Sequence, residues 1–182
     1  MASRRKWTLL AISVAAMVVT AALFVVWSPG QEEDISISIT VDGLVDNPIN
    51  VSLADLKSRQ SATITAELIC VSGISSGTHN WTGARLKDIL DDAGVHADVI
   101  KVAFTASDYY TTDLALGDAI RDDVIIAYLQ DGSPMTEKTR LVVPGKWGYK
   151  WISDLMKIEL VDYDYLGKWE QRGYSDDARI GQ

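Results

Sequence analysis

Apolar and polar side chains alternate with a period of two along residues 34–41, a pattern typical of a half-buried strand. The period changes in residues 83–94, which end at a glycine. Four apolar residues recur there at helical spacing: Leu86, Ile89, Leu90 and Ala93. This stretch therefore predicts an amphipathic helix with one buried face.

Shorter apolar runs predict the remaining elements. Strands are expected at residues 62–71, 99–106, 124–129, 140–144 and 157–163, and short helices at residues 52–57 and 114–120. Turn signals such as Asp131-Gly132 are typical of antiparallel strands, and helices do not alternate regularly with strands. We therefore expect a mixed-sheet α+β fold rather than a doubly wound parallel one.

An uncharged apolar run of 21 positions, residues 7–27, precedes this domain. At about 1.5 Å rise per residue, a helix of this length crosses the roughly 30 Å hydrocarbon layer of a membrane. Basic residues lie in segment 1–6 and acidic residues at 32–34, so the positive-inside rule puts the N-terminus in the cytoplasm. The sequence predicts a single-pass membrane anchor, with a cleaved signal peptide as the alternative.

The paired Arg4 and Arg5 also match the start of a twin-arginine export signal, although two arginines that only set topology are the alternative. On this interpretation the folded domain, residues 35–176, lies on the extracytoplasmic side of the cell membrane. A linker at residues 28–34 joins the domain to the membrane helix, and residues 177–182 form a tail.

The composition excludes several classes of site. The formal net charge is −8 and there is no basic stripe, so binding to nucleic acid is not expected. A single cysteine rules out a disulfide framework, and no CxxC or multi-histidine cluster indicates zinc.

That cysteine, Cys70, lies where the predicted strand 62–71 gives way to small and polar residues. A free cysteine is commonly a buried core residue, which is one interpretation. Outside the cytoplasm, however, an unpaired thiol is open to oxidation unless it is buried or ligated, and a thiolate suits a soft or high-valent metal. His79 in the same loop would permit a Cys/His nucleophile pair, but no third member is identifiable.

A second candidate site is the glycine-containing loop at residues 144–151. Lys146 and Lys150 carry positive charge in an otherwise acidic chain, next to aromatic residues that include Trp147 and Tyr149. Glycines let backbone N–H groups approach an anion and flat rings stack on a heterocycle, so the loop predicts a phosphate-plus-ring site. An exposed aromatic loop that packs on a membrane or a partner is the alternative.

Cys70, residues 81–90 and residues 140–150 stand in an order that resembles the molybdopterin-binding domain of the sulfite oxidase superfamily. Short members related to the catalytic subunit of the periplasmic methionine sulfoxide reductase are the most similar, and the resemblance covers residues 37–174. It implies a molybdenum-molybdopterin cofactor with Cys70 as the thiolate ligand of the metal. It also implies a role for Trp81 and Gly83 at the start of the helix.

The resemblance further implies that a loop with Pro144, Gly148 and Lys150 holds the pterin phosphate, with charge added by Lys146. Trp147, Gly148 and Tyr149 belong to the same predicted cofactor site. Two departures matter. Ser153 replaces a basic residue that relatives usually have, and no arginine follows Cys70, so sulfite is not the favoured substrate.

Together these features predict an oxidoreductase that transfers an oxygen atom, as in the reduction of a small-molecule sulfoxide. Asp108, Tyr109 and His79 are the candidates for the pocket wall beside Cys70. Since no haem or iron–sulfur motif occurs, a separate electron donor or acceptor is needed, for which a membrane protein is one candidate. The alternative is a cofactor-free domain in which Cys70 is buried and the aromatic loop binds a partner.

Overall fold

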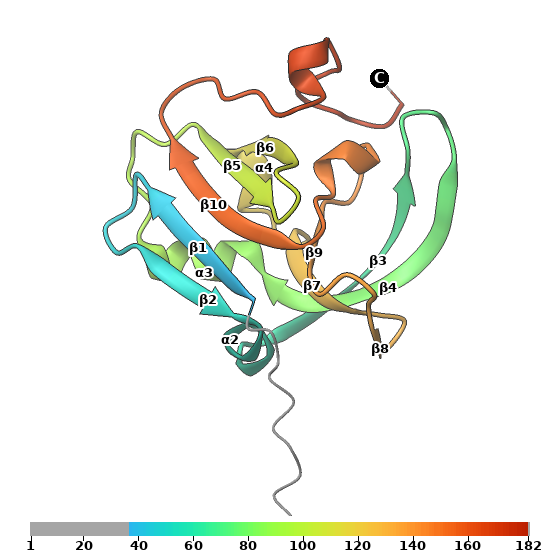
Figure 1. Cartoon of the computed structure of the whole chain (residues 1–182), viewed down its shortest axis with the longest axis horizontal. Helices are drawn as coiled ribbons and strands as arrows, with labels where there is room; N and C mark the ends of the chain where they lie inside the picture. The colour runs from blue at the N-terminus through green and yellow to red at the C-terminus, as the bar shows by residue number, and fades with distance from the viewer. Residues whose placement is uncertain (1–36, 182) are drawn as a thin grey trace, which may run out of the picture. The chain divides into compact units, whose positions relative to one another are not determined.

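The structure, a computed structural model, describes residues 37–181, which form two β-sheets with short helices between and beside them (Figure 1). The expected mixed α+β fold is confirmed. The elements in chain order are β1 (Ser38–Gly43), β2 (Ile49–Ser52), α2 (Leu53–Ser58), β3 (Ser61–Ile69), β4 (Ser75–Arg85), α3 (Leu86–Ala93), β5 (Lys101–Ala106), β6 (Thr111–Ala115), α4 (Leu116–Ala119), β7 (Ile125–Gln130), β8 (Ser133–Pro134), β9 (Arg140–Val142), η1 (Gly148–Lys150), β10 (Leu155–Val161) and η2 (Glu170–Arg172).

The predicted anchor at residues 7–27, the segment before it and the linker at 28–34 lie outside the described residues. Within residues 37–181, no helix is both long enough and apolar enough to cross a membrane. Anchoring and export therefore stay predictions from the sequence.

The first sheet has the strand order β2-β1-β10-β5-β6. Its central strand, β10, pairs in parallel with β1 and antiparallel with β5, so that Ile158 lies between Val41 and Phe104. All three side chains are fully buried. Because β10 is the last strand of the chain and lies at the centre of this sheet, the segment that follows Val161 starts from the middle of the sheet.

The second sheet has the order β3-β4-β7-β8, with β9 also paired to β7. β3 and β4 pair over nearly their whole length, but β4 pairs with β7 only from Trp81 to Arg85. The hairpin beyond Trp81 is therefore a two-stranded ribbon that projects from the sheet (Figure 1). The sequence predicted a loop for the first half of β4, because its residues are polar; in the structure most of them are exposed or half-buried, since no third strand flanks the ribbon.

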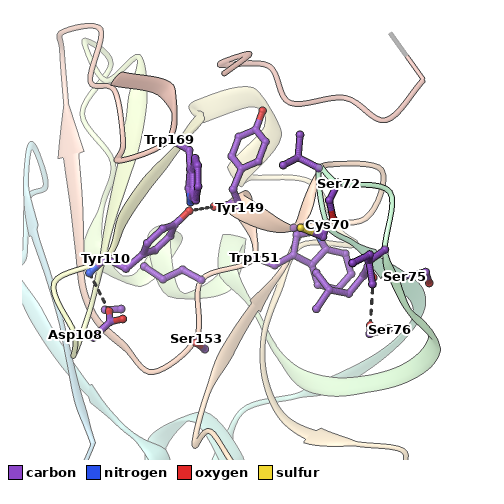
Figure 2. A pocket seen from close by; sticks show the side chains of 16 residues that line it. Cys70, Ser72, Ser75, Ser76, Asp108, Tyr110, Tyr149, Trp151, Ser153 and Trp169 are labelled. Carbon is purple, nitrogen blue, oxygen red and sulfur yellow. Dashed lines mark hydrogen bonds between the residues drawn. The ribbon is translucent and has the colours of Figure 1, made fainter. Parts of the chain in front are cut away.

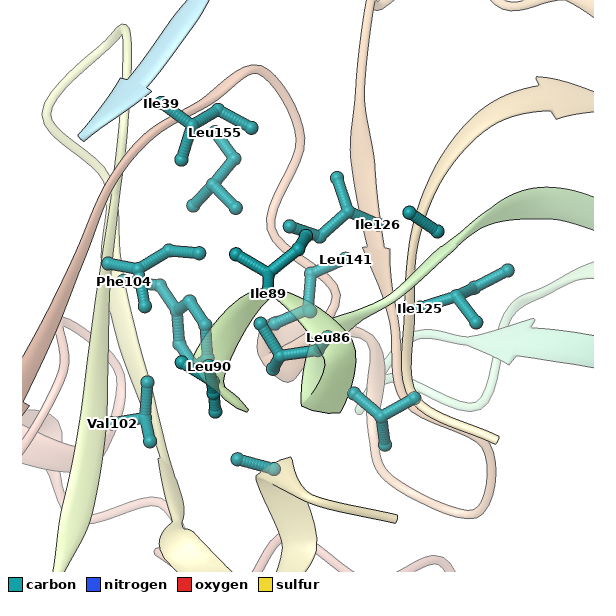
Figure 3. Packing of buried hydrophobic residues seen from close by; sticks show 14 of the residues in the cluster. Ile39, Leu86, Ile89, Leu90, Val102, Phe104, Ile125, Ile126, Leu141 and Leu155 are labelled. Atoms are coloured by element: carbon teal, nitrogen blue, oxygen red, sulfur yellow. The ribbon is translucent and has the colours of Figure 1, made fainter. Parts of the chain in front are cut away.

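The predicted helix at residues 83–94 is confirmed as α3, with its four apolar residues fully buried. They lie between side chains of both sheets, including Phe104 of β5 and Ile126 of β7 (Figure 3). The helix begins at Leu86 rather than at residue 83, because β4 continues to Arg85. Gly94 ends it in the left-handed region at φ 73°.

The helix at residues 52–57 and the other predicted strands are present with ends shifted by at most two residues, except that the strand predicted at 34–41 begins at Ser38. The interpretation of residues 107–120 was partly wrong. A loop followed by a helix was expected, whereas residues Thr111–Ala115 form β6 and α4 covers only Leu116–Ala119. β6 pairs along β5, so tertiary pairing decides the conformation of this polar stretch.

Candidate functional site

Three loops meet around an open pocket of about 730 Å³ (Figure 2). They are the tip of the β3–β4 hairpin, the β5–β6 turn and the stretch that contains η1. Trp169, from the segment after β10, completes the lining. A pocket of this size suits a small organic ligand or cofactor.

Cys70 is on the hairpin tip and lines the pocket. The tip is a tight turn in which the Cys70 N–H donates to the Ile74 carbonyl and the Gly73 N–H donates to the Cys70 carbonyl, each at 2.8 Å. Gly73 adopts φ 83°, which a side chain would disfavour. Cys70 itself is exposed, so its interpretation as a buried core residue is wrong.

Hydrogen bonds from Ser72 stabilise the thiolate form of Cys70. The Ser72 hydroxyl and then its backbone N–H hold the pKa of the Cys70 thiol below its usual range. The thiolate is the form that attacks electrophiles and binds metals. The turn thus presents an accessible thiol whose thiolate form is stabilised by hydrogen bonds.

Ser72→Ala is expected to raise the pKa of Cys70, because the larger of the two stabilising hydrogen bonds is lost. In cofactor-free protein, the alkylation of Cys70 by iodoacetamide should then slow at neutral pH, and its pH profile should move to higher pH. Ser75→Ala is the matched control, since that hydroxyl bonds to Glu67. An unchanged profile for Ser72→Ala would contradict the assignment.

η1 brings two predicted cofactor residues to the pocket, Gly148 and Tyr149. A Cβ on Gly148 would lie 3.1 Å from the Ile69 carbonyl oxygen, so glycine lets η1 pack closely against the end of β3. Tyr149 donates its hydroxyl to the Ser175 carbonyl at 2.6 Å, and burial raises its pKa to about 12. The phenol therefore stays protonated at neutral pH.

The β5–β6 turn supplies Asp108 and Tyr110 rather than Asp108 and Tyr109. Tyr109 takes a left-handed conformation at φ 65°, which turns its side chain outward to 86% exposure. The Tyr110 hydroxyl instead donates to the Tyr149 carbonyl at 2.7 Å, and burial raises its pKa. The position in the pocket wall that was predicted for Tyr109 is therefore occupied by its neighbour Tyr110.

His79 does not line the pocket. It lies on β4, where its Nδ1 is 2.7 Å from Asp131 Oδ2 and its Nε2 is 2.9 Å from the Ser76 carbonyl oxygen. The hydrogen bond to Asp131 raises the pKa of His79. Because one ring nitrogen is paired with Asp131 of the β7–β8 turn and the other with Ser76 of β4, a Cys70/His79 pair is not formed in this structure.

Lys146 and Lys150 are fully buried, and neither they nor Trp147 line the pocket. The Lys146 ammonium lies 2.6 Å from Asp118 and 2.8 Å from Asp177. The Lys150 ammonium is bound by other carboxylates, from β6 and from the segment after β10. Their role as phosphate ligands stays a prediction.

Sequence reasoning missed several lining residues, above all the rings of Tyr110 and Trp169. Trp151 packs edge-on against Trp81 at 5.8 Å between ring centroids. Trp151 is the last residue of the loop 144–151, which the sequence had singled out for its aromatic rings. Asp108 is the one charged side chain among the residues that line the pocket in the described part of the chain.

Comparisons with known proteins found matches over most of the chain. Residues 26–169 match the family model described as oxidoreductase molybdopterin binding domain. Two curated relatives cover most of the chain. The chain is 31% identical over 150 residues to the uncharacterized oxidoreductase YuiH of Bacillus subtilis, which covers 80% of this chain and 76% of that protein.

The chain is also 29% identical over 155 residues to the mitochondrial sulfite oxidase of Drosophila melanogaster, covering 68% of this chain but only 27% of that longer protein. Among solved structures, the sulfane dehydrogenase SoxCD of Paracoccus pantotrophus matches with a TM-score of 0.65 at 21% identity. That match covers 69% of this chain and 38% of that chain, and it supports the fold.

Proposed function

The chain belongs to the sulfite oxidase family of molybdopterin-binding oxidoreductases, and on that premise we propose that it transfers an oxygen atom to or from a small neutral substrate beside Cys70. Sulfoxide reduction is the reaction that fits best. The observation that carries the proposal is an exposed thiol of lowered pKa beside a pocket whose described lining has no cationic side chain.

The charge of the lining favours a neutral substrate over an anion. Oxyanions such as sulfite or nitrate are usually held by arginine or lysine side chains. Here the lining is largely aromatic and aliphatic, and its one charged group is the carboxylate of Asp108. A neutral molecule with an apolar body and one polar S=O group matches these walls better than an anion does.

The residues present fit a molybdenum-molybdopterin group at its metal end and along its rings. A thiolate is the ligand that soft metal centres select, and Cys70 offers it at the pocket surface. The rings of Tyr110, Tyr149 and Trp169 offer flat faces for a heterocycle (Figure 2). When bound, the group would supply the two-electron redox couple for the reaction.

The chain's own residues orient and shield the substrate. In sulfoxide reduction the S–O bond breaks, sulfur keeps an electron pair, and oxygen leaves as water after taking up two protons. The two electrons come from a separate donor, for which a membrane protein is a candidate. Asp108 supplies the carboxyl group among the described lining residues and can pass protons from solvent to the leaving oxygen.

Tyr110 is a poor proton donor, because burial raises its pKa and its hydroxyl is bonded to the Tyr149 carbonyl. It fixes the position of η1 instead. The aromatic rings line one side of the open pocket and would contact the apolar body of the substrate there.

The test uses full-length protein from the membrane fraction of a molybdenum-replete host. It should carry about one molybdenum atom per chain and, with a reduced viologen dye as donor, reduce a neutral sulfoxide. Its kcat/KM should exceed that for sulfite oxidation by about tenfold or more. The control is the same protein from a host that cannot make molybdopterin.

Two results would overturn the proposal. Preference for sulfite would refute the neutral substrate class. Well-folded wild-type protein without molybdenum would favour a cofactor-free domain that binds a partner.

A further inference from the structure

The segment after β10, residues 163–179, crosses one end of the fold near β6; we refer to it as the covering segment (Figure 1). It packs closely on β6. The Lys168 N–H donates to the Thr111 carbonyl at 3.0 Å, and a Cβ on Gly167 would lie 2.5 Å from the Thr112 Cα. The backbone of the covering segment thus lies directly on a strand edge.

Charged groups hold the covering segment along its length. Lys101 binds Asp164 at 2.7 Å and Asp176 at 2.8 Å, while Lys146 binds Asp177. These lysines are buried, whereas most of the carboxylates that they meet arrive from the covering segment. The covering segment is therefore attached to the rest of the domain through the side chains of buried lysines.

Lys150 is the most buried of these attachments, with an exposure of 0%. Its ammonium lies 2.6 Å from Glu170 Oε1, 3.2 Å from Asp113 Oδ1 and 3.4 Å from Asp176 Oδ1. The contacts with Asp113 and Asp176 are hydrogen bonds and the contact with Glu170 is a close ion pair, so three carboxylates surround the ammonium. A phosphate at the same place would add negative charge to a site that already has an excess of it.

Glu170 is also buried, at 5% exposure, and its second partner is the Thr112 hydroxyl at 3.0 Å. Glu170 follows Trp169 directly and begins η2. Trp169 is the residue of the covering segment that lines the pocket, and its ring packs against Tyr174 at 5.0 Å. An attachment at Glu170 therefore fixes the ring one residue away.

We propose that Lys150 is a positioning residue, which holds Glu170 and so keeps Trp169 as a wall of the pocket, and that it is not a ligand of the cofactor phosphate. This replaces the role that the sequence predicted for Lys150. Breaking one partner of a buried ion pair is costly, so the covering segment is released when either Lys150 or Glu170 is neutralised.

The test compares Lys150→Met, Glu170→Gln and the double variant as full-length, cofactor-free protein. Amide hydrogen exchange is measured over residues 163–179. Either single change should speed exchange there by about tenfold or more, and the double variant should add little further. Exchange of α3 should not change. Lys57→Met, at an exposed lysine of α2, is the matched control.

Molybdenum content, measured on the same variants from a replete host, separates the two roles of Lys150. If it positions the covering segment, both single variants lose molybdenum. If it binds phosphate, only Lys150→Met does, while Glu170→Gln frees the ammonium and retains the metal. Retention in Glu170→Gln, or unchanged exchange in either variant, overturns the proposal.

The exchange measurement does not rest on the proposed function, whereas the metal measurement does. Wild-type protein without molybdenum would refute the function and leave the exchange result to decide the role of Lys150. If Lys150→Met does not fold, Glu170→Gln decides alone, since it keeps the shape of the side chain and Lys150 itself.

Discussion

Cys70→Ser is expected to reduce the molybdenum content of the full-length protein to background. Serine is a hard, neutral ligand at this pH, and the chain has no second cysteine to replace the thiolate. In residues 37–181 no group of three or more metal-binding side chains offers another site. Since changes that only support a ligand cost 10- to about 100-fold in affinity, loss of the ligand itself should cost at least about 100-fold.

The measurement is molybdenum per chain by mass spectrometry, on protein whose thermal melt matches that of the wild type. A stable fold is expected for Cys70→Ser, because the side chain is exposed. Ser61→Ala, at the other end of β3, is the control and should keep its metal. Full molybdenum content in Cys70→Ser would mean that the metal is held without the thiolate.

Gly83→Ala is expected to destabilise the fold by about 3 kcal/mol or more, or about 10 °C in the melting temperature. A Cβ at this position would lie 2.1 Å from the Ile126 carbonyl oxygen and 2.5 Å from the Ala127 Cα. Both are backbone atoms of β7, so no side-chain rotation can make room. The added methyl has to push apart two strands at the irregular β4–β7 register beside Gly83.

Thermal and urea unfolding measure the effect. Gly117→Ala is the matched control, because nothing lies within 4 Å of a Cβ there and the glycine is in a helix. Alanine is the better helix former, so that variant should lie within about 1 kcal/mol of the wild type or above it. Equal stability of the two variants would contradict the close approach at Gly83.

Part of this site could be predicted because its signals are local in sequence. Cys70 follows a strand pattern, and the loop with Gly148 and Tyr149 has a recognisable spacing. Gly83 also belonged to a predicted motif, but its role was misassigned. It was expected to start the helix, whereas the structure places it within β4, where a neighbouring strand needs the space.

The choice between Tyr109 and Tyr110 could not be made from sequence. Both follow Asp108 in a polar turn, and alternation alone does not say which side chain faces inward. One residue with positive φ reverses the pattern, and non-glycine residues adopt that conformation rarely. The missed β4 has a related cause, since polar residues on a projecting ribbon lack a buried face.

The partners of the lysines were beyond prediction for another reason. Within the loop 144–151, Lys146 and Lys150 have no acidic neighbour, so the loop carries a net positive charge. For this reason an anion site was expected there. Their carboxylates come from Asp113, Asp118 and the covering segment, far from the loop in sequence. Local charge balance cannot anticipate ion pairs that only the folded chain forms.

The length of the projecting hairpin also sets the distance between Cys70 and the sheet. Beyond Trp81, β3 and β4 pair with no other strand of the described residues, and Cys70 lies at the far end. Each cross-strand pair sets the thiol about 3.4 Å farther from the sheet, and each single step turns it to the opposite face. The orientation of the thiol is therefore preserved only when the hairpin is lengthened or shortened by two cross-strand pairs, or about 7 Å. The distance from the thiol to the sheet can change only in these steps.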